Sequence, residues 1–464
     1  MLKQKPVDYA TASAGALARA LAERQVSALE LFDEAVRAIE AKDAPINAVV
    51  VRDFERAQAA AKAADAALAR GEARPLLGVP MTVKESHNIA GLPTTWGLES
   101  AKGWTPSRDA TGVSRLKAAG AVVLGKTNVP PNLSDWQSNN PVYGRTCNPY
   151  DLTRSPGGSS GGGAAALASG MVPLEYGSDI GGSIRIPAHF CGVFGHKPTW
   201  QIIPPTGHAP PGIEDAGGDV QFAVVGPLAR TAADLDLALS LLAGPEGAEA
   251  AAYRFALPPA RAQSLDAFRV LVVGAHPAAA LDDAVAGPLH RLADQLREAG
   301  ARVESESPLL PDLGAAHEQY MRVLMTIMSR RPGASVEGVI DAHTYMLGLD
   351  IVAAHRRKWA ELFESFDVVL TPPFGTPAFP HTDEPDWAKR TITVNGQPTP
   401  YGAQLAWPGI ATFPGLPATC APIARTPQGL PVGVQIIGPR FEDRTPIAFA
   451  GLIEREFGTG SPPP

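Results

Sequence analysis

The chain has 464 residues, 45% of them hydrophobic, so it can bury a large core. Its formal net charge is −7 and no long basic run stands out, which argues against nucleic acid as a partner. No stretch approaches the roughly 20 apolar residues that span a bilayer, and the first residues lack an apolar run long enough for a secretion signal. We therefore expect a cytoplasmic protein without membrane association.

Helical and strand patterns alternate along the first part of the chain. A helix is expected to begin at Ser27, because Glu30 has capping-box spacing and the following apolar residues recur at helical intervals. The other elements expected here are a strand over 46–51, a helix over 54–70, a buried strand over 76–84, a helix near 110–119 and a strand over 121–126.

The alternation returns after residue 228. The expected elements are helices over 228–244 and 281–299, and strands over 268–274, 301–307, 366–372, 415–423 and 432–438. Alternation of this kind favours a layered α/β fold. The weakest organisation lies between about 245 and 410, where an accessory layer could sit on the core.

Three cysteines lie far apart, at Cys147, Cys191 and Cys420. An odd and scattered set argues against a disulfide framework, and no pair has the spacing of zinc ligands. We expect no metal site.

Three segments carry candidate chemistry. Residues 78–86 (GVPMTVKES) end an apolar strand on Lys84, which alone is best explained as a lysine reaching for solvent. Residues 155–163 (SPGGSSGGG) alone are equally well explained as a flexible loop. In residues 177–187 (GSDIGGSIRIP), consecutive glycines let backbone N–H groups turn toward one point, where they can bind developing negative charge.

Taken together, the three segments supply the parts of a serine hydrolase. A serine nucleophile needs a base, a way to pass on its proton, and an oxyanion hole. Ser183, after two glycines, can supply the nucleophile and the hole in one turn. Ser159 can pass on a proton, and a desolvated Lys84 can be neutral enough to accept it.

These segments resemble the amidase signature family, and the match extends from about residue 8 to residue 456. Further matching segments are 125–128 (GKTN), 226–231 (GPLART) and 415–435, and residues 196–199 (HKPT) are similar to the bacterial branch related to fatty acid amide hydrolases. The resemblance implies one large α/β/α unit, with a central mixed, twisted sheet covered by helices on both faces. Residues 1–464 would form a single catalytic domain, divided into an N-terminal helical region (about 1–75), a catalytic core (about 76–245), and accessory and C-terminal layers (about 246–464).

The resemblance also implies roles for individual residues. Ser183 would be the acylated nucleophile, Ser159 the bridging serine after a cis peptide bond at Gly158–Ser159, and Lys84 the base. The expected oxyanion hole consists of the N–H groups of Ile180, Gly181, Gly182 and Ser183, and the expected supporting residues are Ser160, Asp179 and Arg185. Neither a metal nor a cofactor is implied. The implied reaction converts a small or medium-sized carboxamide to a carboxylate plus ammonia or an amine.

Two departures from the family pattern flank these residues. Many members have Asp-Asn where this chain has Glu85 and Ser86, and many have an acidic residue at the position of Pro131. Neither departure touches Ser183, Ser159 or Lys84. Because neighbouring strand residues face opposite ways, we expect Glu85 to point away from Lys84.

Other functions fit the same residues less well. Ser160 also lies at the centre of a nucleophile-elbow pattern, but residues 154–157 make a poor preceding strand. The glycine-rich run lacks the Gly-Lys-Ser/Thr ending of a P-loop. A non-catalytic binding protein would be expected to have lost the triad of Ser183, Ser159 and Lys84. The remaining rival is the glutaminase subunit of a tRNA-dependent amidotransferase, which commonly has threonine at the Ile180 position.

The substrate is expected to be a soluble small-molecule amide. Loops 130–145, 205–222 and 374–410 are the expected pocket walls, and their aromatic residues favour an apolar or aryl acyl group: Trp136, Tyr143, Phe222, Trp387, Tyr401 and Trp407. The interface of a homodimer would explain the same residues.

Overall fold

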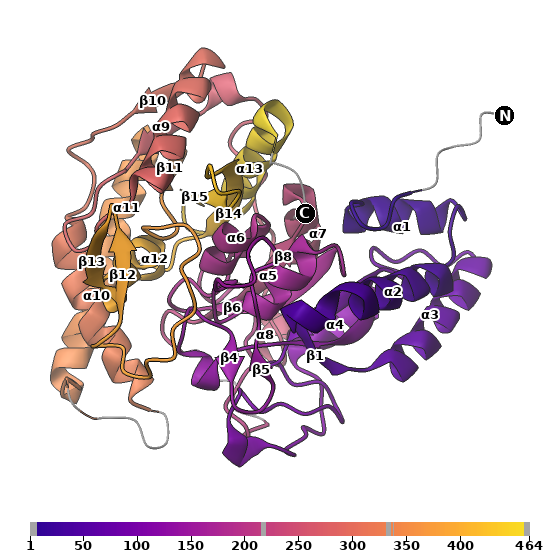
Figure 1. Ribbon diagram of the computed structural model, residues 1–464. Coiled ribbons are helices and arrows are strands. Elements are labelled where there is room, and N and C mark those ends of the chain that lie inside the picture. Colours follow the sequence, from indigo (N-terminus) through magenta and orange to yellow (C-terminus); the bar gives the residue numbers. More distant parts are fainter. Residues whose placement is uncertain (1–6, 215–219, 331–335, 337, 459–464) are drawn as a thin grey trace.

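The computed structural model describes residues 7–214, 220–330, 336 and 338–458. One eleven-stranded sheet runs through this part of the chain (Figure 1). Its strands are β1 (Val49–Arg52), β2 (Pro80–Lys84), β3 (Val122–Thr127), β6 (Leu174–Asp179), β7 (Phe194–Lys197), β8 (Val224–Ala229), β9 (Arg269–Val272), β10 (Arg302–Glu304), β11 (Val368–Thr371), β14 (Ala418–Arg425) and β15 (Pro431–Ile437).

The sheet is mixed, with the strand order β1-β3-β2-β6-β8-β7-β14-β15-β11-β9-β10. Strands β3, β2 and β6 run parallel to one another, as do β10, β9 and β11, and the remaining neighbours are antiparallel. Two small hairpins lie outside it: β4 (Asn139–Asn140) with β5 (Gly144–Arg145), and β12 (Thr391–Val394) with β13 (Gln397–Pro400).

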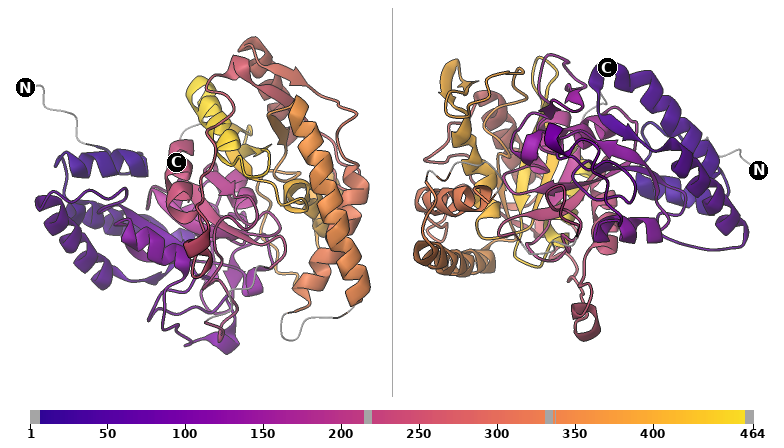
Figure 2. Two further views of the ribbon diagram at one scale, coloured as in Figure 1. Left: turned by 180° about the vertical axis from the view of Figure 1, so that it is seen from behind. Right: turned by 90° about the horizontal axis from the view of Figure 1, so that it is seen from below.

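Helices cover both faces of the sheet. They are α1 (Ala14–Ala22), α2 (Ala28–Ile46), α3 (Phe54–Ala69), α4 (Thr111–Ala118), α5 (Gly161–Ala168), α6 (Arg185–Cys191), α7 (Ala232–Leu242), α8 (Glu249–Ala252), α9 (Asp283–Glu298), α10 (Leu313–Met328), α11 (Ala342–Ser365), α12 (Ala406–Thr412) and α13 (Arg444–Phe457). Helices α5 and α6 pack together over the central strands, and α7 packs against α13. In all three views, α1–α3 lie at one end of the molecule and α9–α11 at the other (Figures 1 and 2).

Local sequence signals explain several element boundaries. The Ser27 hydroxyl accepts from the N–H of Glu30 at 3.1 Å, and the Glu30 carboxylate accepts from the N–H of Ser27 at 2.8 Å, so the expected capping box is confirmed. The helix expected over 228–244 is wrong at its start. Residues 224–229 instead form β8, paired with β6, and α7 begins after Thr231, whose hydroxyl caps it.

The topology brings the three chemistry-bearing segments together. Strands β2 and β6 are parallel neighbours, so Lys84 at the end of β2 and the 180–183 loop after β6 lie at the same edge of the sheet. The glycines of α5 let this helix lie close to the strands. A Cβ at Gly163 would lie 2.5 Å from Glu175 of β6, and one at Gly162 would lie 2.3 Å from the backbone of Asn128.

Candidate active site

Lys84 is fully buried at the end of β2. Its ammonium donates to the hydroxyl of Ser159 at 2.6 Å and to that of Ser178 at 2.9 Å. Burial lowers the pKa of Lys84 to about 7, although the carboxylates of Asp179 and Glu175 oppose the shift. The explanation of Lys84 as a lysine reaching for solvent is therefore wrong. Near neutral pH this amine can exchange a proton with a serine hydroxyl.

Two glutamates lie near Lys84, Glu85 and Glu175, and their hydrogen-bond partners differ. Glu85 points away from it, as expected, because its carboxylate accepts from the N–H groups of Thr95 at 2.6 Å and Trp96 at 3.0 Å. Glu175 accepts from two threonine hydroxyls of β2 and β3. Burial raises the pKa of Glu175 to about 7, against the opposing effects of these hydrogen bonds and of Lys84.

The serine-rich loop before α5 lies against the 180–183 loop. The Gly158–Ser159 peptide bond is cis. The N–H of Ser160 donates to the carbonyl of Ser183 at 3.1 Å, and its hydroxyl donates to the carbonyl of Ser178 at 3.2 Å. The loop that precedes Ser160 contains no strand, so the nucleophile-elbow explanation is wrong.

Ser183 occupies the turn that precedes α6 and is 6% exposed. Of the four N–H groups expected to form the oxyanion hole, that of Gly182 donates to Oδ1 of Asp179 at 2.9 Å. The N–H groups of Ile180, Gly181 and Ser183 donate to no residue in the described part of the chain. A hydrogen bond between the hydroxyls of Ser159 and Ser183 is likewise absent from the contacts among described residues.

Gly182 allows this turn to form. Its φ of +92° is a conformation that side-chain-bearing residues rarely adopt, and a Cβ there would lie 2.5 Å from Ile186.

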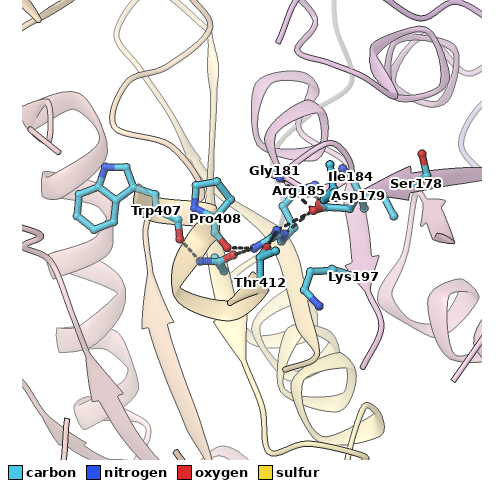
Figure 3. Close-up of polar contacts among 12 residues, drawn as sticks. Ser178, Asp179, Gly181, Ile184, Arg185, Lys197, Trp407, Pro408 and Thr412 are labelled. Atoms are coloured by element: carbon cyan, nitrogen blue, oxygen red, sulfur yellow. Dashed lines mark hydrogen bonds and ion pairs between the residues drawn. The ribbon is translucent and has the colours of Figure 1, made fainter. Parts of the chain in front are cut away.

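Arg185 and Asp179 form a fully buried ion pair of 2.7 Å (Figure 3). The guanidinium also donates to the carbonyl of Pro408 at 2.9 Å, the hydroxyl of Thr412 at 2.8 Å and the side chain of Gln435. Burial alone would raise the pKa of Asp179, but Arg185 outweighs it and lowers this pKa to about 2. Because every arm of Arg185 is engaged inside the protein, its geometry is that of a structural residue.

Two histidines stand near Lys84, the buried His87 and the partly buried His208. Nε2 of His208 lies 3.0 Å from the hydroxyl of Ser86, and His87 stacks on Tyr176 with ring centroids 4.2 Å apart. Burial and the charge of Lys84 lower the pKa of His208 to about 3, and the pKa of His87 is also well below its ordinary value. Both rings are therefore neutral at physiological pH.

Most of the expected pocket aromatics share one cluster. Trp136, Phe222, Trp387 and Tyr401 pack together with Tyr320 and Phe374, beside Ile180 of the 180–183 loop. Two expected members lie elsewhere. Trp407 belongs to a separate cluster, and the Tyr143 hydroxyl donates to Glu85 at 3.0 Å.

In the described residues, no group of three or more His, Cys, Asp or Glu side chains could hold a metal ion. Of the helices in that part of the chain, none is both long enough and apolar enough to cross a membrane.

A family model and several known proteins match most of this chain. A family model described as amidase matches residues 30–333 and 324–446. The chain is 34% identical over 474 residues to AmiB2 of Mycobacterium tuberculosis, covering 97% of each protein. It is 33% identical over 483 residues to a subunit of the glutamyl-tRNA(Gln) amidotransferase of Roseiflexus castenholzii, covering 94% of each.

Among solved structures, the fold matches a protein from a vestigial complex that reveals the origins of an s-triazine catabolic enzyme. The TM-score is 0.83 at 30% identity, covering 96% of this chain and 99% of that one.

Proposed function

The chain belongs to the amidase family, and from that premise we propose that it hydrolyses the amide bond of a small or medium-sized carboxamide. Ser183 acts as the nucleophile, Ser159 as the bridging serine and Lys84 as the base. One observation supports this most: Lys84 is fully buried and hydrogen-bonded to Ser159 at 2.6 Å, beside the Ser183 loop.

In the acylation half, Oγ of Ser183 bonds to the amide carbonyl carbon. Its proton passes to Ser159, whose own proton passes to the neutral amine of Lys84. The carbonyl oxygen becomes an oxyanion that backbone N–H groups of the glycine loop stabilise. When the C–N bond breaks, the proton returns along the same chain, so nitrogen leaves as ammonia or an amine.

In the deacylation half, a water oxygen bonds to the acyl carbon and its proton takes the same route to Lys84. The ester bond to Ser183 then breaks as Lys84 returns this proton to Ser183 through Ser159. The product acid releases its remaining proton to solvent and leaves as the carboxylate. The relay requires the hydroxyls of Ser159 and Ser183 to come within hydrogen-bond distance. Catalytic hydrogen bonds of this kind often tighten only in the substrate complex.

The aromatic cluster beside Ile180 favours an apolar or aryl acyl group. Trp136 supports this placement, since its indole donates to the carbonyl of Gly181 at 3.0 Å. A panel of short aliphatic amides, aryl amides, anilides and fatty amides should show the highest kcat/KM for the aryl substrates.

Labelling tests the nucleophile directly. A fluorophosphonate should modify Ser183 in the parent chain, as read by mass spectrometry, and Ser183→Ala should fold but neither label nor turn over amides. Labelling of Ser160 would count against the proposal.

A second candidate is glutamine hydrolysis within a tRNA-dependent amidotransferase, because the amidotransferase relative from Roseiflexus castenholzii is 33% identical over nearly its full length. The isoleucine at position 180 favours the stand-alone amidase instead. Turnover of simple amides by the purified chain would support the first candidate. Activity restricted to glutamine and dependent on added partner proteins would support the second.

A further inference from the structure

Two aromatic side chains from distant segments hold residues 180–183, the loop that contains the proposed nucleophile and is called the nucleophile loop here. The hydroxyl of Tyr320, on α10, donates to the carbonyl of Ile180 at 3.0 Å. The indole of Trp136 donates to the carbonyl of Gly181 at 3.0 Å. Both side chains are almost completely buried, at 0% and 2% exposure, and the Gly181 carbonyl is in a buried residue, whereas Ile180 is partly exposed.

These contacts fix the orientation of peptide planes. A trans peptide unit is planar, and its N–H points opposite to its C=O. Holding the Ile180 carbonyl therefore also fixes the direction of the Gly181 N–H. Holding the Gly181 carbonyl fixes the Gly182 N–H, which donates to Asp179 at 2.9 Å. The next unit is fixed as well, because the Gly182 carbonyl accepts from the N–H of Ile186 at 2.8 Å.

The backbone N–H groups of the nucleophile loop fall into two sets, those with and those without an acceptor in the part of the chain that the structure describes. The Gly182 N–H is committed to Asp179, whereas those of Gly181 and Ser183 donate to no described residue. Glycine at 181 and 182 has no side chain to restrict these planes, so external contacts must hold them. Of the contacts that hold the Gly181 N–H in place, the most direct is the one from Tyr320.

Both aromatic side chains are themselves rigidly placed. The Tyr320 ring packs against Phe222 with centroids 5.5 Å apart, and it fills the space left by Gly409, where a Cβ would lie 2.9 Å from the ring. Trp136 packs against Tyr401 with centroids 4.9 Å apart, and its carbonyl accepts from the hydroxyl of Ser155 at 2.7 Å.

We propose that Tyr320 and Trp136 are positioning residues: Tyr320 aims the N–H of Gly181 at the oxyanion formed during amide hydrolysis, and Trp136 fixes the next peptide plane, between Gly181 and Gly182. The inference rests on the proposed function. Neither side chain exchanges a proton with the substrate. Their effect is confined to the alignment of donors that act mainly in the transition state, so their loss should lower kcat and leave KM almost unchanged.

Tyr320→Phe is the most direct test, because it removes one hydroxyl and keeps the ring. Tyr9→Phe is the matched control: the Tyr9 hydroxyl is also buried and donates to a carbonyl, that of Met171, at 2.8 Å. Both variants lose one buried hydrogen bond, but only Tyr320 contacts the nucleophile loop.

Active sites are first counted by fluorophosphonate labelling of Ser183, so that kcat refers to folded, competent enzyme. Loss of a whole oxyanion donor costs about 10²–10³ in kcat. Tyr320→Phe misaligns a donor that remains, so we expect kcat to fall about tenfold or more. Trp136→Phe should act in the same direction, and Tyr9→Phe should match the parent.

A trifluoromethyl ketone supplies a readout that a merely structural role would not move. Its adduct with Ser183 carries an oxyanion, so its inhibition constant should rise in Tyr320→Phe by the same factor as kcat falls. The pH midpoint of turnover should stay in place, because Lys84 is untouched.

Unchanged kcat and inhibitor affinity in Tyr320→Phe, with an active and labelled parent, would overturn the inference while leaving the proposed function intact. Equal losses in Tyr320→Phe and Tyr9→Phe would overturn it as well. A parent that neither labels at Ser183 nor cleaves amides would refute the proposed function, and the inference with it.

Discussion

The buried position of Lys84 predicts how amide turnover should depend on pH. A free lysine titrates near ~10.4, so only about one molecule in 2,500 holds a neutral amine at pH 7. Burial lowers the pKa of Lys84 to about 7, and roughly half of the molecules then hold the neutral base at that pH. The fraction of competent base is therefore about a thousandfold larger than for an exposed lysine.

The sign of the dependence follows from the role of the base. Below its pKa, Lys84 is protonated and cannot accept the proton of Ser159. Turnover should therefore fall about tenfold per pH unit below neutrality and reach a plateau above it. Two neighbouring groups do not titrate in this window, since the pKa of Asp179 is about 2 and that of His208 about 3.

The assay is kcat/KM measured from about pH 5 to about pH 10 at constant ionic strength. Two further groups have pKa values of about 7, Glu175 and Lys197, so a variant of each identifies the titrating group. Glu175→Gln removes a negative charge that raises the pKa of Lys84, so the midpoint should move to lower pH. Lys197→Met should leave the midpoint in place, because Lys197 is not among the charges that shift the pKa of Lys84, which are those of Asp179 and Glu175.

A profile that stays flat between about pH 6 and 9 would contradict the role of Lys84 as the base, and so would one that rises only with a midpoint near ~10, the value of an exposed lysine. A midpoint that moves with Lys197→Met but not with Glu175→Gln would assign the titration to Lys197 instead of Lys84. Full amide turnover by Lys84→Ala, with an unchanged profile, would remove Lys84 from the mechanism altogether.

Four further outcomes are expected. Lys84→Met should raise the free energy of unfolding at pH 6 by a few kcal/mol. The gain is about 1.36 kcal/mol for each unit by which burial lowers the pKa of Lys84, reduced by the energy of the hydrogen bonds that are lost. This gain should shrink as pH rises toward ~10.4, because the folded pKa lies below the unfolded one and the penalty is complete only below both; urea titrations at two pH values measure it. Arg185→Met should lower the free energy of unfolding by about 3–5 kcal/mol in the same assay, since it leaves Asp179 buried without its partner. Ser27→Ala should cost about 1 kcal/mol by removing one half of the capping box with Glu30. Exhaustive chelation should leave turnover unchanged, because Lys84 supplies the base in the proposed mechanism; a loss restored by zinc would count against that mechanism.

The sequence predicted the groups that could carry chemistry because each sits in a short segment of unusual composition. A lysine that closes an apolar strand, and glycines that precede a serine, are visible without knowing what lies beside them. The layered α/β fold followed from alternating periodicities. The prediction of a helix over 228–244 was wrong at its start. The pairing of β8 with β6, a strand distant in the sequence, overrides the local helical pattern there.

Contacts between distant segments were beyond such reasoning. The hydroxyl of Ser178 reaches Lys84, and that of Tyr320 reaches Ile180, only once β2, β6 and α10 are placed. Tyr320 lies in the region where the sequence showed the weakest organisation, and an isolated tyrosine on a helix carries no signal of its partner. The commitment of the Gly182 N–H to Asp179 was equally hidden, because it depends on the turn geometry rather than on residue type.

These contacts imply that the geometry of the 180–183 loop is set largely by segments that contribute no group to the proposed mechanism. Asp179 holds the loop from one side and is itself held by Arg185, which reaches α12 and β15 (Figure 3). Tyr320, on α10, holds it from another side. The aromatic cluster expected to contact the acyl group includes the same Tyr320. Substitutions elsewhere in this cluster that displace the Tyr320 ring should therefore lower kcat, because in the proposed mechanism Tyr320 aligns an oxyanion donor.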